Sequence, residues 1–157
     1  MDKVKTFVIL GMHKSTTSLV AKALHEAGIH MGNEFLPKGE YEFYENKDFV
    51  QLNDRILAAA GGDQRNPPPH EDILKQDFSA EIKELIDKHQ KPLWGWKDPR
   101  TTLTIDLYLP YLKDPHFIPI FRDPEKVAKR YKGDTSLAEE YNRRLINFLH
   151  AHYNSRE

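Results

Sequence analysis

An apolar run that leads through a basic, hydroxyl-rich segment straight into a helical pattern constrains this chain most. The run Phe7-Val8-Ile9-Leu10 is short and apolar, as expected of a buried strand. After the segment 11–18, apolar residues recur at helical spacing over 19–27, and Gly28 is a natural helix stop. At a strand-to-helix turn, the first backbone N–H groups of the helix have no intrahelical partner, and the helix dipole favours an anion beside them. The segment therefore predicts a phosphate-binding loop.

The loop only partly follows the Walker A pattern of nucleotide-binding proteins. Gly11 takes the position of the first glycine and Thr16 that of the second, while Thr17 stands at the lysine and Ser18 at the magnesium-binding hydroxyl. Two of these four positions do not match. The lysine of this chain, Lys14, lies three residues earlier, so we expect its charge to reach an anion from the loop and not from the helix.

Strand and helix patterns alternate along the rest of the chain. We expect strands at 94–96 and 116–121, a rigid connector at 67–69, and helices at 46–60, 80–89, 102–112, from 124 onward and at 136–153. Such alternation predicts an α/β fold, a three-layer arrangement in which a mostly parallel sheet is covered by helices on both faces.

Four basic residues are expected to lie together at the edge of the sheet where ligands of such folds bind. Ligands of parallel sheets lie beyond the carboxyl ends of the strands. Four cationic side chains follow expected strand ends and are therefore expected to converge there: Lys14, Lys97, Arg100 and Arg122.

Composition narrows the class of protein. With 157 residues the chain has room for one domain, and its hydrophobic fraction of 39% and charged fraction of 30% are typical of a globular protein. The absence of cysteine excludes disulfides and thiolate chemistry, and we expect a cytoplasmic location without a signal peptide or membrane span. A net charge of -1 argues against nucleic acid as a partner, so an anion site must be local. The histidines lack metal-binding spacing, and no metal is expected.

Four segments, in the same order along the chain, resemble the bacterial type of sulfotransferase that uses 3′-phosphoadenosine 5′-phosphosulfate (PAPS). They are the loop at 11–18, the block at 44–54, the turn at 94–100 and the segment at 120–128. In that family the loop has a Lys/Arg-Ser-Gly-Thr pattern. Lys14, Ser15 and Thr17 match it, while Thr16 stands where the family usually has glycine.

The resemblance implies a fold, a co-substrate and a set of residues. The fold would be that of P-loop nucleoside triphosphate hydrolases, in one domain over 1–157 that lacks the C-terminal part of the family domain. PAPS would donate a sulfuryl group to the hydroxyl or amine of a small-molecule or glycan acceptor, without a metal. Lys14 would act in catalysis, and the residues that bind PAPS would be His13, Lys14, Ser15, Thr16, Thr17, Ser18, Arg122 and Arg130.

Several roles stay open at this stage. Glu45 is the first candidate for the catalytic base by its position in the motif, although a carboxylate favoured by a helix N-terminus would occur there too. His70 is the second candidate, against the alternative of a solvated loop histidine. Lys97 and Arg100 would contact the substrate or pair with nearby acids. Arg130 replaces a serine of the family, so it would either bind the 3′-phosphate of PAPS bidentately or block its pocket.

Two other functions compete with sulfuryl transfer. A nucleotide-binding module would keep the affinity for PAPS and lack transfer activity. A kinase-like or hydrolytic P-loop protein would need the Walker lysine, which this loop lacks.

Overall fold

Three parallel strands form the centre of the molecule in the computed structural model, which describes residues 3–15, 17–33, 44–131 and 134–154. The strands are β1 (Lys5–Leu10), β2 (Leu93–Lys97) and β3 (Pro115–Pro119), in the order β2-β1-β3. Val8 of the central strand pairs with Trp96 on one side and with Phe117 on the other. The predicted α/β class and the parallel sheet are confirmed.

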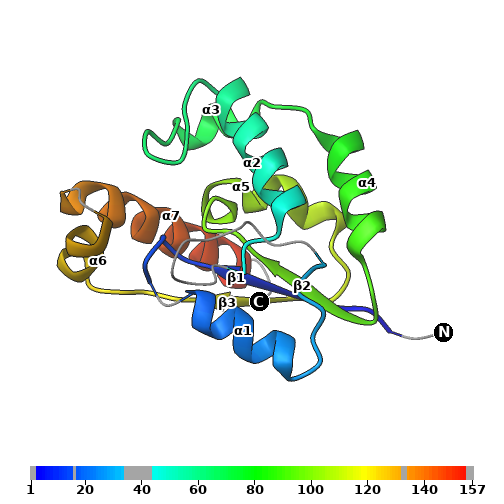
Figure 1. Ribbon diagram of the computed structural model, residues 1–157. Coiled ribbons are helices and arrows are strands. Elements are labelled where there is room, and N and C mark those ends of the chain that lie inside the picture. The colour runs from blue at the N-terminus through cyan, green and yellow to red at the C-terminus, as the bar shows by residue number, and fades with distance from the viewer. Residues whose placement is uncertain (1–2, 16, 34–43, 132–133, 155–157) are drawn as a thin grey trace.

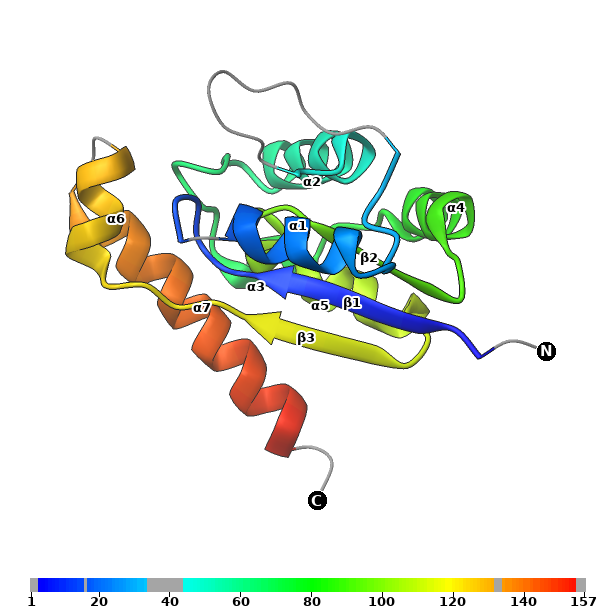
Figure 2. The same ribbon diagram turned by 60° about the horizontal axis from the view of Figure 1, so that its bottom comes forward.

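Helices lie on both faces of this sheet. Helix α1 (Thr17–Glu26) covers one face, while α5 (Thr101–Tyr108) and α7 (Thr135–Asn154) lie on the other (Figures 1 and 2). The remaining helices within the described ranges are α2 (Lys47–Ala59), α3 (His70–Leu74), α4 (Ser79–His89) and α6 (Pro124–Tyr131). Since every strand runs the same way, all three carboxyl ends meet at one edge of the sheet, which is where the loop after β1 begins.

Aromatic side chains fill the core between the sheet and α2. Trp94 and Trp96 are almost completely buried, and Phe49 of α2 stacks on Trp96 with 4.2 Å between ring centroids. Between the two tryptophans, Gly95 lies opposite Phe7 in the ladder. A Cβ atom at Gly95 would lie 1.9 Å from the Phe7 carbonyl oxygen, so a glycine is required for β2 to approach β1 this closely. Because β2 lies this close to β1, Lys97 at the end of β2 pairs with Ile9 beside the start of the loop.

One predicted helix differs from the structure, and one helix of the structure was not predicted. The helix expected at 102–112 ends as α5 at Tyr108 and continues as a 3₁₀ turn over Leu109–Tyr111, because Pro110 has no N–H for the α-helical bond. After the proline connector, the unpredicted helix α3 begins at His70, and the amide groups of Asp72 and Ile73 donate to the Pro69 carbonyl. Five residues are too few for an apolar period to be visible in the sequence.

Among the described residues, the model contains no helix that is both long and apolar enough to cross a membrane.

Candidate functional site

The loop after β1 is clamped at its start by two neighbouring elements. The Gly11 amide donates to the Thr102 hydroxyl of α5 at 2.9 Å, and the Ile120 amide after β3 donates to the Leu10 carbonyl at 2.8 Å. A Cβ atom at Gly11 would lie 2.7 Å from the Ile120 carbonyl oxygen, so glycine allows this close approach. The first residue of the loop is therefore held between α5 and the end of β3.

Lys14 turns the loop toward α1 and joins it to a distant arginine. Its backbone is left-handed, with a φ of 64°, and its carbonyl accepts a hydrogen bond from Nη1 of Arg122 at 3.0 Å. Ser15 and Thr17 are buried beside it, and α1 begins at Thr17. Two predicted PAPS contacts, Lys14 and Arg122, thus lie together although 108 positions separate them in the chain. Thr16, another predicted contact, lies outside the described residues.

A buried group of charges lies behind the loop, and we call Glu45, Lys97, Asp98 and Arg100 the Glu45 cluster. Glu45 Oε1 is 3.2 Å from Lys97 Nζ, and Glu45 Oε2 is 3.6 Å from Arg100 Nη1. Arg100 Nη1 also lies 2.8 Å from Asp98 Oδ1, while its Nε is 2.8 Å from Asp54. The side chains of Glu45 and Lys97 are only 6% and 2% exposed. Glu45 thus contacts both residues that were expected to bind substrate.

An asparagine that was not predicted supports this cluster. Asn53 of α2 donates from Nδ2 to Asp98 Oδ2 at 2.8 Å, and its Oδ1 accepts from the hydroxyl groups of Thr104 and Tyr108, both at 2.8 Å. Asp98 is completely buried between Asn53 and Arg100. Asn53 lies in the block at 44–54, but that motif did not indicate that its side chain would support Asp98.

The position of Glu45 differs from that of a capping carboxylate. Asn46 is the N-cap of α2, and its side chain accepts hydrogen bonds from the amides of Asp48 and Phe49. Glu45 precedes this cap and contacts Lys97 instead. Glu45 therefore makes no capping bond to α2, although it lies immediately before the helix N-terminus.

Burial changes the proton affinities of the Glu45 cluster. It raises the pKa of Glu45, and Asp98 adds to the rise, while Lys97 and Arg100 oppose it. Burial lowers the pKa of Lys97, against the attraction of Glu45. Both shifts favour the uncharged forms, so the pKa values of the carboxyl and the amine lie closer together than in water. Burial alone would lower the pKa of Arg100 too, but Asp98, Asp54 and Glu45 raise it, so Arg100 stays cationic.

His13 lies where the loop and the Glu45 cluster meet. Its Nε2 is 3.9 Å from Glu45 Oε1, and its side chain is 14% exposed. Burial lowers the pKa of His13 well below its usual value, and the nearby cations Arg100, Lys97, Lys14 and Arg65 lower it further. His13 is therefore neutral at pH 7, and its contact with Glu45 is not an ion pair at that pH.

Four cations therefore lower the pKa of His13, and three of them, Lys14, Lys97 and Arg100, were predicted as site residues. Arg65 was not predicted, because it lies in the connector between α2 and α3, where no motif marks it. A pocket of about 260 Å³ lies beside it, lined by Met12 of the loop and by residues that precede or belong to α6 and α7. On the other side, Lys97 Nζ lies 3.4 Å from the Ser18 hydroxyl of α1 and joins the Glu45 cluster to the helix start.

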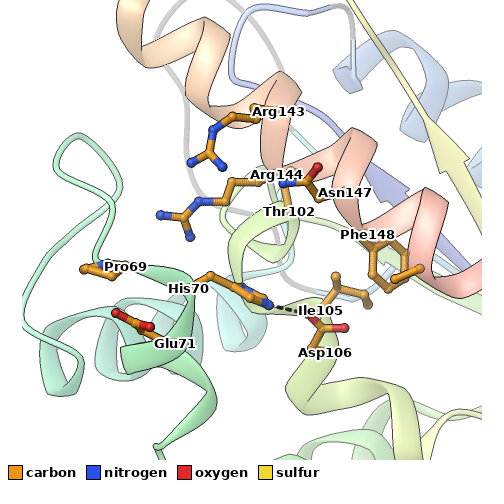
Figure 3. Close-up of a pocket in the computed structure, with 11 residues that line it drawn as sticks. Pro69, His70, Glu71, Thr102, Ile105, Asp106, Arg143, Arg144, Asn147 and Phe148 are labelled. Atoms are coloured by element: carbon orange, nitrogen blue, oxygen red, sulfur yellow. Dashed lines mark ion pairs between the residues drawn. The ribbon is translucent and has the colours of Figure 1, made fainter.

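One predicted site residue, His70, lies elsewhere. His70 begins α3 and lies 3.0 Å from Asp106 of α5, in a separate pocket whose lining includes no residue of the segment 11–18 (Figure 3). The side chain of His70 is 45% exposed, as expected of a solvated histidine, although it belongs to a helix and not to a loop. Glu45 is not among the residues that line this pocket. Arg130 is exposed in the last turn of α6. Within the part of the chain that the structure describes, no group of three or more His, Asp or Glu side chains is arranged to hold a metal ion.

No protein-family model, curated protein sequence or solved structure matches this chain. The resemblance to sulfotransferases therefore stays a prediction from the motifs, and the geometry of the site is the independent argument for a function.

Proposed function

We propose that this chain binds PAPS at the loop after β1 and transfers its sulfuryl group to an acceptor hydroxyl or amine, on a fold related to P-loop nucleoside triphosphate hydrolases. The observation that supports this most is the bond from Arg122 to the Lys14 carbonyl. This bond holds the Arg122 guanidinium beside the loop. PAPS carries two separate anionic groups, the 5′-phosphosulfate and the 3′-phosphate, so its site requires a cation near each of them. Lys14 and the α1 N-terminus would bind the 5′-phosphosulfate, and Arg122 would bind the 3′-phosphate.

In the proposed reaction, positive charge and a base supply the catalysis. The bond from sulfur to the phosphate oxygen breaks while a bond from sulfur to the acceptor oxygen or nitrogen forms, in line with the leaving group. Lys14 stabilises the negative charge that remains on the phosphate. Glu45 accepts the acceptor proton, and its raised pKa makes it a stronger base than an exposed glutamate. His13, which is neutral at pH 7 and lies beside Glu45, would hydrogen-bond PAPS or the acceptor.

One observation favours a binding module without transfer activity as the second candidate. Both carboxylate oxygens of Glu45 already face cations, one from Lys97 and one from Arg100. A carboxylate held in this way has less access to an acceptor proton. Binding of PAPS without turnover would be the result for such a module.

Variants of the loop test the proposed binding site. We expect Lys14→Ala and Arg122→Ala each to weaken binding of 3′-phosphoadenosine 5′-phosphate, the desulfated product, by about 10-fold to 100-fold, because each removes a charge-assisted contact. Lys22→Ala is the matched control, because Lys22 lies on α1 with its side chain 48% exposed and pairs only loosely with Glu26 at 4.0 Å. Unchanged affinity in both loop variants would exclude this assignment.

Glu45→Gln separates the two candidates. If Glu45 is the base, this variant should keep its affinity for 3′-phosphoadenosine 5′-phosphate. The rate at which it converts PAPS to that product, measured with a panel of hydroxyl and amine acceptors, should fall about 100-fold or more. If the native chain binds the product but turns over none of these acceptors, the binding module is the better description.

A further inference from the structure

A second pocket, which we call the α3–α7 pocket, lies between α3, α5 and α7 and has a volume of about 500 Å³. Figure 3 shows the arginine side chains of α7 on one side of it and the pair of His70 and Asp106 on another. The side chains that the argument uses are His70, Ile105, Asp106, Arg143, Arg144 and Phe148. Neither the proposed PAPS site nor its mechanism uses this pocket.

Arg144 has a buried donor group without a partner. Its side chain is 8% exposed, its Nε donates to Glu140 at 2.7 Å, and its Nη2 donates to the Pro68 carbonyl at 2.7 Å. Its Nη1 is buried and finds no hydrogen-bond partner among the residues that the structure describes. In Figure 3 the guanidinium extends toward Pro69 and His70. A buried donor costs free energy until an acceptor reaches it, so this position favours a ligand oxygen.

The arginine side of the pocket carries more positive than negative charge. Arg143 and Arg144 are neighbours on α7 and both bind the single carboxylate of Glu140. Two guanidinium groups therefore share one anion, which leaves an excess of about one positive charge. Arg143 is 59% exposed, so its side chain can turn toward a ligand at little cost.

The other parts of the pocket differ in character. Phe148 and Ile105 are buried side chains that give the pocket an apolar wall. His70 Nε2 and Asp106 Oδ2, 3.0 Å apart, offer hydrogen-bonding groups away from the arginines. Glu71 also lines the pocket and disfavours a second anionic group there. An organic molecule with one acidic end, an apolar body and a neutral polar end matches this distribution.

We propose that the α3–α7 pocket binds a small organic carboxylate, with the carboxylate on Arg143 and Arg144, an apolar or aromatic body against Phe148, and a hydroxyl group near His70 and Asp106. Arg144 Nη1 supplies the buried contact, and Arg143 completes a two-arginine clamp. This site is distinct from the phosphate loop and does not depend on the proposed sulfuryl transfer.

The test compares matched acidic and neutral probes. Titration of ¹⁵N-labelled protein with para-hydroxyphenylacetate should shift backbone amide signals of His70, Glu71 and residues 143–148, and the loop signals of 11–15 should move least. The neutral para-hydroxyphenylacetamide should bind at least 10-fold more weakly, because it lacks the charge for the arginines. Equal affinity for both probes, shifts centred on the loop, or no binding of the acid at millimolar concentration would overturn the proposal.

Two arginine variants test whether the carboxylate of the acidic probe binds Arg143 and Arg144. Arg143→Gln and Arg144→Gln should each weaken the acidic probe by about 5-fold to 20-fold and leave the neutral amide unchanged. Arg143 is exposed, so its variant folds even where loss of the Arg144 contact to Pro68 unfolds the chain. Arg55→Gln is the control, because Arg55 pairs with Glu81 and lies over Phe78, outside this pocket. Native affinity in Arg143→Gln together with native affinity in a folded Arg144→Gln would refute the clamp, as would equal weakening in Arg55→Gln.

Discussion

Two clusters in this molecule both combine acidic and basic side chains, but they differ in burial and in how completely their polar groups are paired. The Glu45 cluster is buried behind the loop after β1, and each of its charges contacts at least one opposite charge. In the α3–α7 pocket the pair of His70 and Asp106 is 45% and 33% exposed, and Arg144 keeps a donor without a partner among the described residues. The first cluster satisfies its own charges, while the second leaves one group for a ligand.

Solvent explains why the two clusters should behave differently. Removing a charge from water costs several kcal/mol, so a buried ion must keep its partners, and losing one leaves the other uncompensated. An exposed pair gains little because water already solvates both groups. The Glu45 cluster should therefore govern the stability of the site, while the exposed pair of His70 and Asp106 in the α3–α7 pocket should contribute little to stability.

The largest expected effect comes from breaking the buried cluster at Lys97. Lys97→Met should lower the free energy of unfolding by about 3–5 kcal/mol, because the Glu45 carboxylate would stay buried without its closest cation. Urea denaturation monitored by circular dichroism measures the loss. Lys22→Met on exposed α1 is the control and should change stability by less than about 0.5 kcal/mol. Losses of equal size would show that burial does not distinguish these lysines.

Double variants sharpen the comparison. Glu45→Gln combined with Lys97→Met should lose about 1–3 kcal/mol less than the sum of the two single variants, because each single variant strands a buried charge. The same cycle with His70→Gln and Asp106→Asn should give a coupling below about 0.5 kcal/mol, since this pair is half-exposed. A stronger coupling in the α3–α7 pocket than in the Glu45 cluster would reverse our account.

His13 predicts a pH dependence of stability. The folded chain holds His13 neutral, with its pKa well below the usual value, while the unfolded chain takes up a proton near the usual pKa of about 6.5. Because the unfolded state binds more protons in this window, stability should fall as the pH falls from 7 to 5, by about 1–2 kcal/mol from this residue. His13→Gln should remove this part of the fall.

A second histidine calibrates that measurement. Burial also lowers the pKa of His30, though less strongly, so His30→Gln should remove a smaller part of the fall. If native protein and His13→Gln lose the same stability between pH 7 and pH 5, His13 does not stay neutral in the folded chain.

The smallest effect is expected in the α3–α7 pocket. Asp106→Asn should change the free energy of unfolding by no more than about 1 kcal/mol, because its partner His70 is half-exposed. Thermal unfolding of the variant beside the native protein measures this. A loss comparable to that of Lys97→Met would mean that the pocket is a structural part of the core.

Local sequence patterns predicted much of the fold. The apolar run before Gly11 and the helical period after it predicted β1, the loop and α1, because all three depend on neighbouring residues. The final helix was expected at 136–153 and spans Thr135–Asn154. Helix α3 was missed because its formation depends on the Pro69 carbonyl and on burial of Ile73, which tertiary packing provides.

The site was predictable only where motifs mark it. The expected strand ends placed Lys14, Lys97, Arg100 and Arg122 together, and the structure brings each of them to the loop or to the cluster behind it. Motif position favoured Glu45 over His70 as the base, and the structure places Glu45 beside the loop residue His13 and His70 in another pocket. Arg65 and Arg144 lie in no motif, and the block at 44–54 contains Asn53 without indicating its role, because these roles follow from contacts between segments far apart in the chain.

Calorimetric titration with 3′-phosphoadenosine 5′-phosphate, beside ATP with magnesium, tests the central proposal most directly. Our account predicts saturable one-to-one binding of 3′-phosphoadenosine 5′-phosphate and no comparable binding of ATP with magnesium, because in the proposed site Arg122 would bind a 3′-phosphate that ATP lacks. Binding of neither nucleotide, or of ATP with magnesium alone, would contradict the assignment of the loop as a PAPS site.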